Sequence, residues 1–426
     1  MQNFLIKQSS LNGTIKIPPS KSETMRALLF ASLAKGKSTI YDYLPSDDTT
    51  YMANACEAFG AEFKFVKNEA EVLGVAGKVK ICRPSIFAGN SGIILRFCSA
   101  ILALDSKKIT ITGDQSLSKR PMEQLIKGLR ALDVKTAFQD QNISIPLSIQ
   151  GPIKPGKIKI SGEDSQPVSA LLIAASLTKE PIEIEVENPG EKPWVALTLS
   201  WFDRLNIPYQ NKEFKFYKTF GSSVFNGFSY SIPGDLSTAA FPIGAALVTN
   251  STLTLQNVDM NSLQGDKELI YLFQKMGALI EIEEETKTLY VKKGSSLKGV
   301  DADINDFIDS IAILAVVACF ASGKTHIYNA KIAKEKECNR LFAISQELKK
   351  MGAQIEETKD GLIITPSPLK GALVSSHKDH RIAMALAVAG LGVSGETVIL
   401  DTSCTSKTYP AFVKDFQSIN AHIEEV

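Results

Sequence analysis

The sequence lacks a large net charge, because its 47 Lys and Arg residues are offset by 46 Asp and Glu residues, which leaves a formal charge of +1. A balanced chain has no overall field to attract nucleic acid or an acidic membrane, so we expect neither as a partner. Any anion that the protein recognises must therefore meet a local group of cations.

Cysteine pairs and long apolar runs are also lacking. The six cysteines are scattered without a CxxC pair, which predicts reduced thiols and excludes a disulfide framework. The first twenty residues contain no apolar run of signal-peptide length, and later apolar segments are broken by Gly and Ser before they reach the length of a membrane span. We expect a cytoplasmic protein without membrane association.

Histidine is scarce, with four residues in the chain. His377 and His380 lie three apart, but without a third nearby ligand they are weak evidence for a metal site, and we expect no metal and no cofactor. Cys338 and Cys404 lie beside charged motifs, and a nucleophilic role for either thiol stays open at this point.

What the sequence does have is length and a repeated pattern. Its 426 residues exceed one ordinary core, so two domains are expected. An amphipathic run, a residue that tolerates left-handed backbone and a short alternating strand recur six times, at spacings of 68 to 75 residues. The turn residues are Gly60, Asp133, Asn206, Gly277, Gly352 and Asn420. Since Gly, Asn and Asp favour a left-handed helix end, we predict six copies of one α/β unit.

Each repeat also contains a very apolar helix with a polar entry. These helices are expected within residues 22–34, 90–104, 164–177, 235–248, 306–321 and 378–392. Being apolar on nearly all faces, they are predicted to be buried. Several carry a cation near the helix N-terminus, where the macrodipole is already positive, and an anion held between the two would explain that placement.

Eight cations fall at such entries or in short Gly, Ser and Thr contexts. They are Lys21, Arg26, Arg96, Arg120, Lys336, Arg340, Arg381 and Lys407. Taken singly, most of them are better explained as a solvated surface charge or a structural ion pair than as part of a binding site. Taken together, at equivalent positions of repeated units, they favour an anion site in which Arg grips carboxylate or phosphate and Lys supplies a point charge.

Several motifs allow both a structural and a functional interpretation. Residues 88–97 fit a helix entry that cradles phosphate or a plain tight turn. Lys336, Glu337 and Arg340 are expected on one helical turn, either as a salt bridge or as a carboxylate poised to move a proton. Asp309 is explained by an N-cap of the apolar helix, or by catalysis. At Asp47 and Asp48 we keep the capping interpretation.

The motifs PSKSETMR, GNSG with a later Arg, KRPM, DSQ, GD-S-AAF, the Asp of FIDS, KE-x-x-R, DHR-x-AM and C-x-x-KT-x-P occur in this order along the chain. In this order they resemble the 5-enolpyruvylshikimate-3-phosphate synthase family, over essentially the full length. The resemblance implies a two-lobed inside-out α/β barrel of six repeated βαβαββ units, three per lobe. It places residues 1–18 and 234–426 in lobe one and residues 19–233 in lobe two.

The resemblance further implies transfer of the enolpyruvyl group of phosphoenolpyruvate to the 5-hydroxyl of shikimate 3-phosphate, by addition and elimination, without a cofactor or a covalent enzyme adduct. A monomer is expected. The residues implied for phosphoenolpyruvate are Lys21, Gly92, Arg120, Gln166, Arg340, Arg381 and Lys407. The residues implied for shikimate 3-phosphate are Lys21, Ser22, Arg26, Ser165, Gln166, Asp309 and Lys336.

The implied catalytic residues are Lys21, Asp309, Glu337 and Lys336. Asp309 is expected to take the proton of the 5-hydroxyl, and Glu337 to move the proton at the methylene carbon. Lys336 is expected to assist both carboxylates electrostatically, while Lys21 contacts the phosphoenolpyruvate phosphate and the 5-hydroxyl.

The chain departs from the family pattern at several positions. Asp164 and Glu191 replace serines that contact the 3-phosphate, and they would repel it unless Lys192 compensates or the side chains turn away. Asn339 replaces an aspartate. Residues 92–97 read GIILRF where the family reads GTAMRP, so we expect a tighter pocket near Gly92 and reduced sensitivity to glyphosate.

Other functions remain as alternatives. UDP-N-acetylglucosamine 1-carboxyvinyltransferases share the fold and the donor, but they have Asn after the first lysine and a reactive loop cysteine. Here Ser22 follows Lys21, and residues 116–121 contain no cysteine. An acceptor that is another phosphorylated cyclitol, and a non-catalytic anion-binding paralogue, are the other two alternatives.

Overall fold

The computed structural model describes residues 2–140 and 142–426, and the chain divides into two compact units. Unit 1 contains the residues up to Ser20 together with Pro233–Val426, and unit 2 contains Lys21–Ile232. Each unit has its own cluster of buried hydrophobic side chains. No helix within the described residues combines the length and the apolar character that crossing a bilayer requires.

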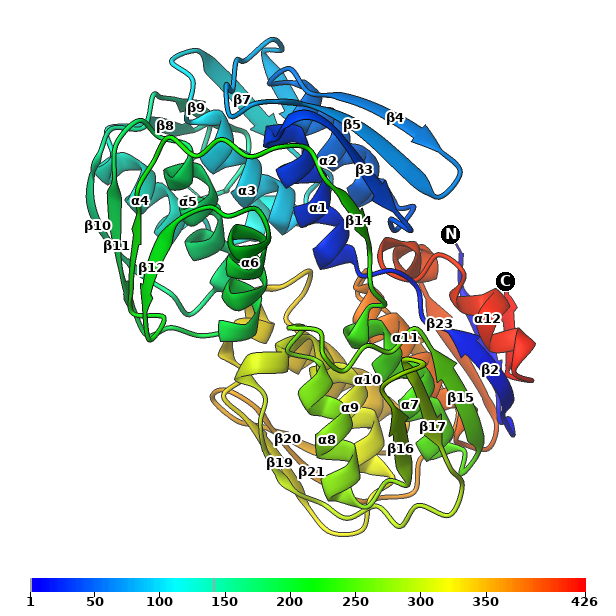
Figure 1. Ribbon diagram of the computed structural model, residues 1–426. Helices are drawn as coiled ribbons and strands as arrows, with labels where there is room; N and C mark the ends of the chain where they lie inside the picture. The colour runs from blue at the N-terminus through cyan, green and yellow to red at the C-terminus, as the bar shows by residue number, and fades with distance from the viewer. Residues whose placement is uncertain (1, 141) are drawn as a thin grey trace. The chain divides into compact units, whose positions relative to one another are not determined.

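The described residues of unit 2 form three four-stranded sheets (Figure 1). The first has the order β14 (Ser229–Ser231), β3 (Lys35–Tyr41), β5 (Glu69–Val75), β4 (Glu62–Val66). The second has the order β6 (Ser85–Phe87), β7 (Lys108–Thr112), β9 (Leu147–Gln150), β8 (Lys135–Phe138). The third has the order β10 (Gly156–Ser161), β11 (Ile182–Glu187), β13 (Phe216–Thr219), β12 (Tyr209–Lys212).

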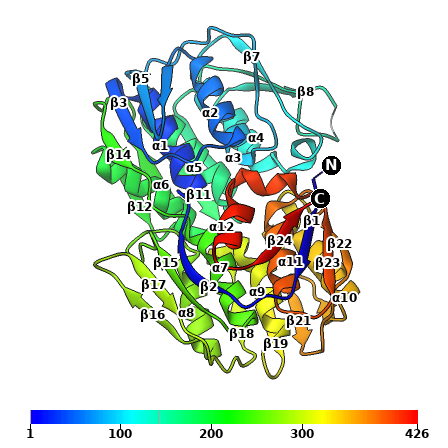
Figure 2. The same ribbon diagram turned by 90° about the vertical axis from the view of Figure 1, so that its right-hand side faces the viewer.

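The described residues of unit 1 also form three four-stranded sheets. The first has the order β16 (Ile280–Glu283), β17 (Thr288–Val291), β15 (Thr252–Gln256), β2 (Asn12–Lys16). The second has the order β18 (Asp301–Asp303), β19 (Thr325–Tyr328), β21 (Leu362–Thr365), β20 (Gln354–Glu357). The third has the order β22 (Leu373–Ser375), β23 (Glu396–Leu400), β1 (Phe4–Lys7), β24 (His422–Glu425), so both chain ends share one sheet (Figure 2).

Two helices accompany each sheet. Those of unit 2 are α1 (Lys21–Leu33), α2 (Asp47–Glu57), α3 (Gly92–Leu102), α4 (Glu123–Ala131), α5 (Ser165–Ser176) and α6 (Lys192–Arg204). Those of unit 1 are α7 (Leu236–Val248), α8 (Lys267–Met276), α9 (Ile311–Cys319), α10 (Arg340–Lys350), α11 (His380–Leu391) and α12 (Phe412–Ser418). Short 3₁₀ helices are η1 (Leu117–Lys119), η2 (Asn305–Ser310), η3 (Lys331–Glu335) and η4 (Thr402–Lys407).

The predicted helix-to-strand turn is confirmed in all six repeats. Each of the six turn residues has a positive φ, between 54° and 107°. Each follows an even-numbered helix and precedes a strand that lies at the edge of its sheet, as Gly60 precedes β4 and Asn420 precedes β24. The left-handed residue ends the helix and reverses the chain, which is why the same three residue types recur at this position.

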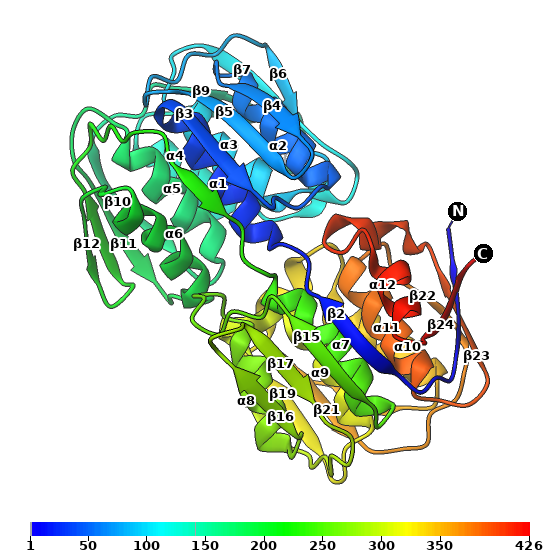
Figure 3. The ribbon, with the colours of Figure 1, turned by 45° about the vertical axis from the view of Figure 1, so that its right-hand side comes forward.

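The odd-numbered helices are buried, as the sequence predicts. Every residue of α3, α7, α9 and α11 is buried. In unit 1, α11 packs against α7 and α9, and in unit 2, α3 packs against α5. Figure 3 shows α5 and α6 on the same face of the sheet that contains β10, β11 and β12. Helix N-termini are thereby held by a rigid core, and these ends carry the residues that the sequence singles out.

Two capping predictions are wrong. Helix α9 begins at Ile311 with Ser310 at its N-cap, so Asp309 lies one residue earlier, in η2. The N-cap of α2 is Ser46, whose hydroxyl accepts a hydrogen bond from the Thr49 N–H, and Asp47 with Asp48 occupies the first helical turn. In that turn the two carboxylates still favour the positive end of the helix dipole.

The prediction that Lys336, Glu337 and Arg340 share one helical turn is also wrong. Lys336 is the C-cap residue that follows η3, and α10 begins only at Arg340 with Asn339 as its N-cap. The Asn339 side chain accepts a hydrogen bond from the Phe342 N–H, so an asparagine that replaces the family aspartate still caps this helix.

Candidate active site

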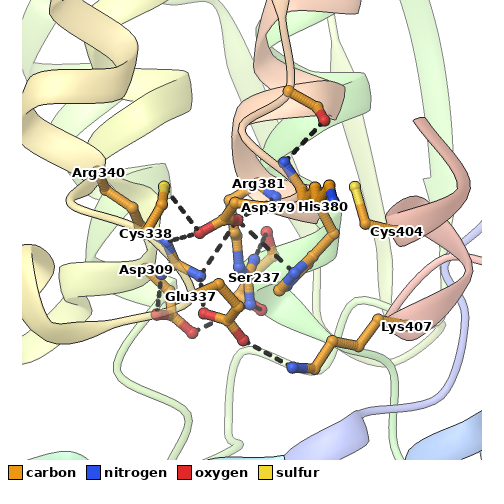
Figure 4. Close-up of polar contacts among 12 residues, drawn as sticks. Ser237, Asp309, Glu337, Cys338, Arg340, Asp379, His380, Arg381, Cys404 and Lys407 are labelled. Carbon is orange, nitrogen blue, oxygen red and sulfur yellow. Dashed lines mark hydrogen bonds and ion pairs between the residues drawn. The ribbon is translucent and has the colours of Figure 1, made fainter. Parts of the chain in front are cut away.

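The described residues of unit 1 contain a cluster of charged side chains at the starts of its helices (Figure 4). We call it the unit 1 cluster, and its members are Ser237, Asp309, Glu337, Arg340, Asp379, Arg381 and Lys407. Ser237 lies in the first turn of α7, Arg340 in that of α10 and Arg381 in that of α11. Helix packing therefore brings together residues that are far apart in the sequence.

Arg340 is at the centre of the unit 1 cluster and is 1% exposed. Its Nη1 lies 2.7 Å from Asp309 Oδ1, its Nη2 lies 2.8 Å from Glu337 Oε2, and its Nε lies 2.7 Å from Asp379 Oδ2. Burial disfavours the cation, but the three carboxylates outweigh this effect and raise the pKa of Arg340 well above its ordinary value. The guanidinium therefore stays charged and fixes three acids around itself.

Arg381 joins the same acids from α11. Its Nη2 donates to Ser237 Oγ at 2.6 Å and to Asp309 Oδ2 at 3.1 Å, while Nη1 donates to the Ser237 carbonyl at 3.0 Å. Its Nε is buried and has no hydrogen-bond partner among the described residues. A buried donor without a partner is costly, and an anionic ligand would satisfy it.

Lys407 completes the cluster from the end of η4. Its Nζ lies 2.8 Å from Glu337 Oε1, so the Glu337 carboxylate is bridged between Lys407 and Arg340. Both side chains of this pair are 8% exposed. A carboxylate held between two cations in a nearly dry site is positioned to exchange a proton with a bound molecule.

Sequence reasoning missed Asp379 as a member of the site. Its carboxylate accepts from the Arg381 N–H at 2.8 Å, as the N-cap of α11, and also holds Arg340. The signal was present, because Asp379 is the first residue of the DHR motif. A capping aspartate is common, so nothing in the sequence distinguished this second contact.

The two cysteines of this region are not thiolates at neutral pH. Burial raises the pKa of the Cys404 thiol to about 12, and burial together with Asp379 raises that of Cys338 still further. A nucleophilic thiol needs a lowered pKa, so neither residue supports covalent catalysis. His377 Nε2 lies 2.8 Å from Glu347 Oε1, and no group of described His, Cys, Asp and Glu residues is arranged to hold a metal ion.

Unit 2 contains a second cluster, around the first residue of α3. A Cβ atom added to Gly92 would lie 2.6 Å from Arg120 Nη1, 2.8 Å from Arg96 Nη1 and 3.4 Å from Gln166 Oε1. Three polar side chains therefore converge on a helix N-terminus that only glycine leaves accessible. Arg96 Nη1 donates to Gln166 Oε1 at 2.9 Å, which fixes the amide. We call these four residues the Gly92 cluster.

The two acids that the sequence marked as departures are both engaged at the N-terminus of α5. Asp164 caps the helix by accepting from the Gln166 N–H at 2.9 Å, and its other oxygen lies 3.2 Å from Arg96 Nη2. Glu191 is 2% exposed and accepts from the Ser165 N–H at 3.1 Å and the Ser165 hydroxyl at 3.0 Å. Ser165 is thus tied to a carboxylate in this structure.

The opening of α1 holds the remaining unit 2 candidates. Lys21 and Ser22 are its first two residues and are half-buried. Arg26 lies one turn later, where it donates to Thr198 Oγ1 and to the Trp194 carbonyl, both at 3.0 Å, and faces the Phe97 ring at 5.3 Å. Burial lowers the pKa of Arg26 to about 10, so it remains a cation at neutral pH.

The predicted residues therefore fall into two groups. Unit 1 brings together Asp309, Glu337, Arg340, Arg381 and Lys407, whereas Lys336 lies half-buried directly after η3, outside the contacts just described. Unit 2 brings together Gly92, Arg120 and Gln166, with Ser165 nearby on α5. In unit 1 three cations lie among three carboxylates, and in unit 2 two arginines and an amide converge on a helix N-terminus. Both places combine cations with the donors of a helix N-terminus, which suits small anionic molecules.

Comparison with known proteins gives a consistent result. The family model described as EPSP synthase (3-phosphoshikimate 1-carboxyvinyltransferase) matches residues 5–416. The 3-phosphoshikimate 1-carboxyvinyltransferase of Chlamydia caviae is 43% identical over 427 residues, which cover 100% of this chain and 95% of that protein. The protein of the same name from Chlamydia pneumoniae is 42% identical with the same coverage.

Solved structures agree in fold. The EPSP synthase of Acinetobacter baumannii superposes with a TM-score of 0.84 at 26% identity, covering 100% of both chains. The enolpyruvyl transferase NikO of Streptomyces tendae superposes with a TM-score of 0.80 at 16% identity, covering 100% of this chain and 99% of that one, and this likeness is one of fold alone.

Proposed function

The chain belongs to the EPSP synthase (3-phosphoshikimate 1-carboxyvinyltransferase) family, and we propose that its two charged clusters bind the anionic groups of that family's two substrates. It transfers the enolpyruvyl group of phosphoenolpyruvate to the 5-hydroxyl of shikimate 3-phosphate and releases phosphate, in the shikimate pathway to aromatic amino acids. Each substrate carries a carboxylate and a phosphate. Burying such charges requires paired cations, which is what both clusters supply.

Arg340 and Arg381 are proposed to clamp the carboxylate of phosphoenolpyruvate. The single observation that carries this role is the unpartnered Nε of Arg381, beside a guanidinium that already holds three carboxylates. Arginine forks match carboxylate geometry, and the buried donor gains a partner when the ligand binds. Lys407 is proposed to contact the phosphate.

This arrangement couples binding to catalysis. Before the substrate binds, Arg340 and Arg381 stabilise the charge of Asp309, and Arg340 and Lys407 that of Glu337. A substrate carboxylate competes for the same guanidinium donors, so it weakens their hold on the two acids. Asp309 and Glu337 thereby become stronger bases when the donor substrate is in place.

In the proposed mechanism Asp309 accepts the proton of the 5-hydroxyl as its oxygen attacks C2 of phosphoenolpyruvate. Glu337 in its protonated form gives a proton to the methylene carbon, which becomes a methyl group in a tetrahedral intermediate. Glu337 then takes a proton back from that methyl group, which restores its protonated form. The enol double bond re-forms, and phosphate departs with the proton that Asp309 had accepted. Lys336 and Lys21 are proposed to assist by stabilising negative charge on the reacting oxygens.

Unit 2 is proposed to bind the remaining anionic groups. The phosphate of phosphoenolpyruvate is assigned to Gly92, Arg120, Gln166 and Lys21. The convergence of polar atoms on Gly92 supports this assignment. Ser22 and Arg26 are assigned to the shikimate carboxylate, and Ser165 with Gln166 to the 3-phosphate. We also propose that the two units are the family's two lobes, each an inside-out barrel of three βαβαββ units, and that the protein acts as a cytoplasmic monomer.

The test is phosphate release from phosphoenolpyruvate by the purified protein, with and without shikimate 3-phosphate, and with UDP-N-acetylglucosamine in a parallel reaction. We expect release only with shikimate 3-phosphate. Asp309→Asn should lower kcat by about 10²- to 10⁴-fold, the usual contribution of a general base, while phosphoenolpyruvate still binds. Release with the nucleotide sugar, or with neither acceptor, would contradict the assignment.

A further inference from the structure

A carboxyl group that the mechanism does not use lies behind the unit 1 cluster. Asp266 occupies the N-cap position of α8, but its side chain makes no capping hydrogen bond. It is completely buried, and its Oδ1 accepts from the Ser310 hydroxyl at 3.0 Å. Its Oδ2 is buried without a hydrogen-bond partner among the described residues. The side chain is therefore directed to Ser310, the neighbour of Asp309, and away from its own helix.

The charges around Asp266 make a second carboxylate unfavourable there. Facing it are Asp309 of η2, Asp235 at the N-cap of α7 and Arg381 of α11. Asp235 is engaged by the Thr238 N–H at 3.0 Å, and Arg381 donates to Ser237 and Asp309. Lys267, the next residue and the first of α8, directs its Nζ to the Met260 carbonyl. The contacts described here direct Arg381 and Lys267 to other groups, and neither forms an ion pair with Asp266.

An unpartnered oxygen is tolerated more easily when the group is neutral. A buried carboxylate oxygen without a donor is a severe loss of solvation, whereas the carbonyl oxygen of a carboxylic acid loses much less. Burial raises the pKa of Asp266 to about 7, and the nearby Asp309 and Asp235 act in the same direction, while Arg381 and Ser310 oppose them. The geometry and the charges thus agree on a protonated side chain.

We propose that Asp266 is a positioning residue that carries a proton in its buried site and, through Ser310, holds Asp309 against Arg340 and Arg381. This role rests on the proposed function of Asp309 as the base. A neutral Asp266 leaves the positive charge of Arg381 available to the phosphoenolpyruvate carboxylate. When Asp266 ionises, it adds a negative charge beside Arg381 and weakens that interaction.

The first experiment is infrared spectroscopy of the wild-type protein and of Asp266→Asn as a function of pH. We expect the wild type to show the band of a buried protonated carboxyl group at pH 6, which fades as the pH rises through about 7. The band should be absent from Asp266→Asn and present in Asp259→Asn, a control whose carboxylate pairs with Lys287 at 2.8 Å. A wild type without the band, or Asp266→Asn with it, overturns the proposal.

The second experiment measures the KM for phosphoenolpyruvate across the same pH range. We expect the wild-type KM to rise about fivefold above pH 7, a typical size for coupling between two sites, and the KM of Asp266→Asn to change markedly less. Ser310→Ala should lower kcat, because it breaks the link to Asp309, without removing the pH dependence of KM. An identical pH dependence in the wild type and Asp266→Asn contradicts the proposal.

The two experiments separate this inference from the proposed function. If Asp309→Asn keeps full activity, the role of Asp309 as base is wrong, yet the infrared band still reports whether Asp266 holds a proton. If Asp266→Asn fails to fold, the pH titration of the wild-type band decides the protonation, and Ser310→Ala decides whether the link to Asp309 affects kcat.

Discussion

The carboxylate of Glu191 accepts two hydrogen bonds from one residue, Ser165, at 3.1 Å from its N–H and 3.0 Å from its hydroxyl. Glu191 reaches this position with a left-handed backbone, at φ 44°, which is unusual for a residue with a side chain. A negative group therefore occupies the N-terminus of α5, where the helix dipole favours an anion. The 3-phosphate site proposed at Ser165 and Gln166 lies beside this charge.

We expect Glu191→Gln to lower the KM for shikimate 3-phosphate by about fivefold, because it removes a negative charge while keeping an oxygen that accepts from Ser165. The change in kcat should be small. Steady-state kinetics will measure the KM for shikimate 3-phosphate. The control is Glu180→Gln, which changes an exposed acid of the same unit. An unchanged or higher KM would show that the charge of Glu191 does not weaken binding of shikimate 3-phosphate.

Gly92 should tolerate no side chain. A Cβ atom there would lie 2.6 Å from Arg120 Nη1 and 2.8 Å from Arg96 Nη1, so Gly92→Ala has to displace one of the two guanidinium groups. We expect the KM for phosphoenolpyruvate to rise about tenfold, equivalent to about 1.4 kcal/mol. Gly156→Ala, where the nearest atom is Leu132 Cδ2 at 3.4 Å, is the matched control and should behave as the wild type.

Arg340→Lys should lower both the free energy of unfolding and the affinity for phosphoenolpyruvate. Lysine keeps the charge but has no planar fork, so it cannot hold Asp309, Glu337 and Asp379 together. We expect a loss of about 3 kcal/mol in the free energy of unfolding, because buried carboxylates lose their partner. Denaturant titration measures this loss, and Arg83→Lys at an exposed pair with Glu57 is the control. Equal stability of the two variants would count against a central role for Arg340.

Asp266 should make the protein less stable as the pH rises from about 4 to 7. The folded pKa of about 7 exceeds the ordinary 3.8, so the folded state holds a proton that the unfolded state has lost. Stability from this group is fully present below the unfolded pKa and falls on the order of 4 kcal/mol as the pH passes through the folded value. The difference in unfolding free energy between the wild type and Asp266→Asn should therefore shrink from pH 4 to pH 8. A constant difference would contradict the shifted pKa.

We expect weaker inhibition by glyphosate than in members of the family that have Thr and Pro in the first turns of the corresponding helix. Here Ile93 is 7% exposed, and the buried Phe97 ring packs against Arg26. The double change Ile93→Thr with Phe97→Pro should increase sensitivity, as measured by competition with phosphoenolpyruvate. Inhibition of the wild type as strong as in ordinary members would refute the expectation.

The local organisation of the chain was readable from the sequence. Whether a residue adopts the left-handed conformation after an amphipathic helix depends on its own side chain and its immediate neighbours. Gly60 and Asn420 therefore predict the same turn in distant parts of the chain. The apolar character of α3 and α9 likewise predicts burial without knowledge of the neighbours. Motif order was sufficient to indicate the family, because each motif is short and contiguous.

Pairing between distant residues was decided only by the tertiary structure. Asp309 resembled an N-cap, but it bonds Arg340, 31 residues later, and Arg381, 72 residues later. Nothing in the sequence singled out Asp266, and only folding reveals that it is buried against Ser310 with one oxygen unpartnered. Local propensity determines which helices and turns form, whereas a charge acquires its role from the partners and the burial that packing gives it.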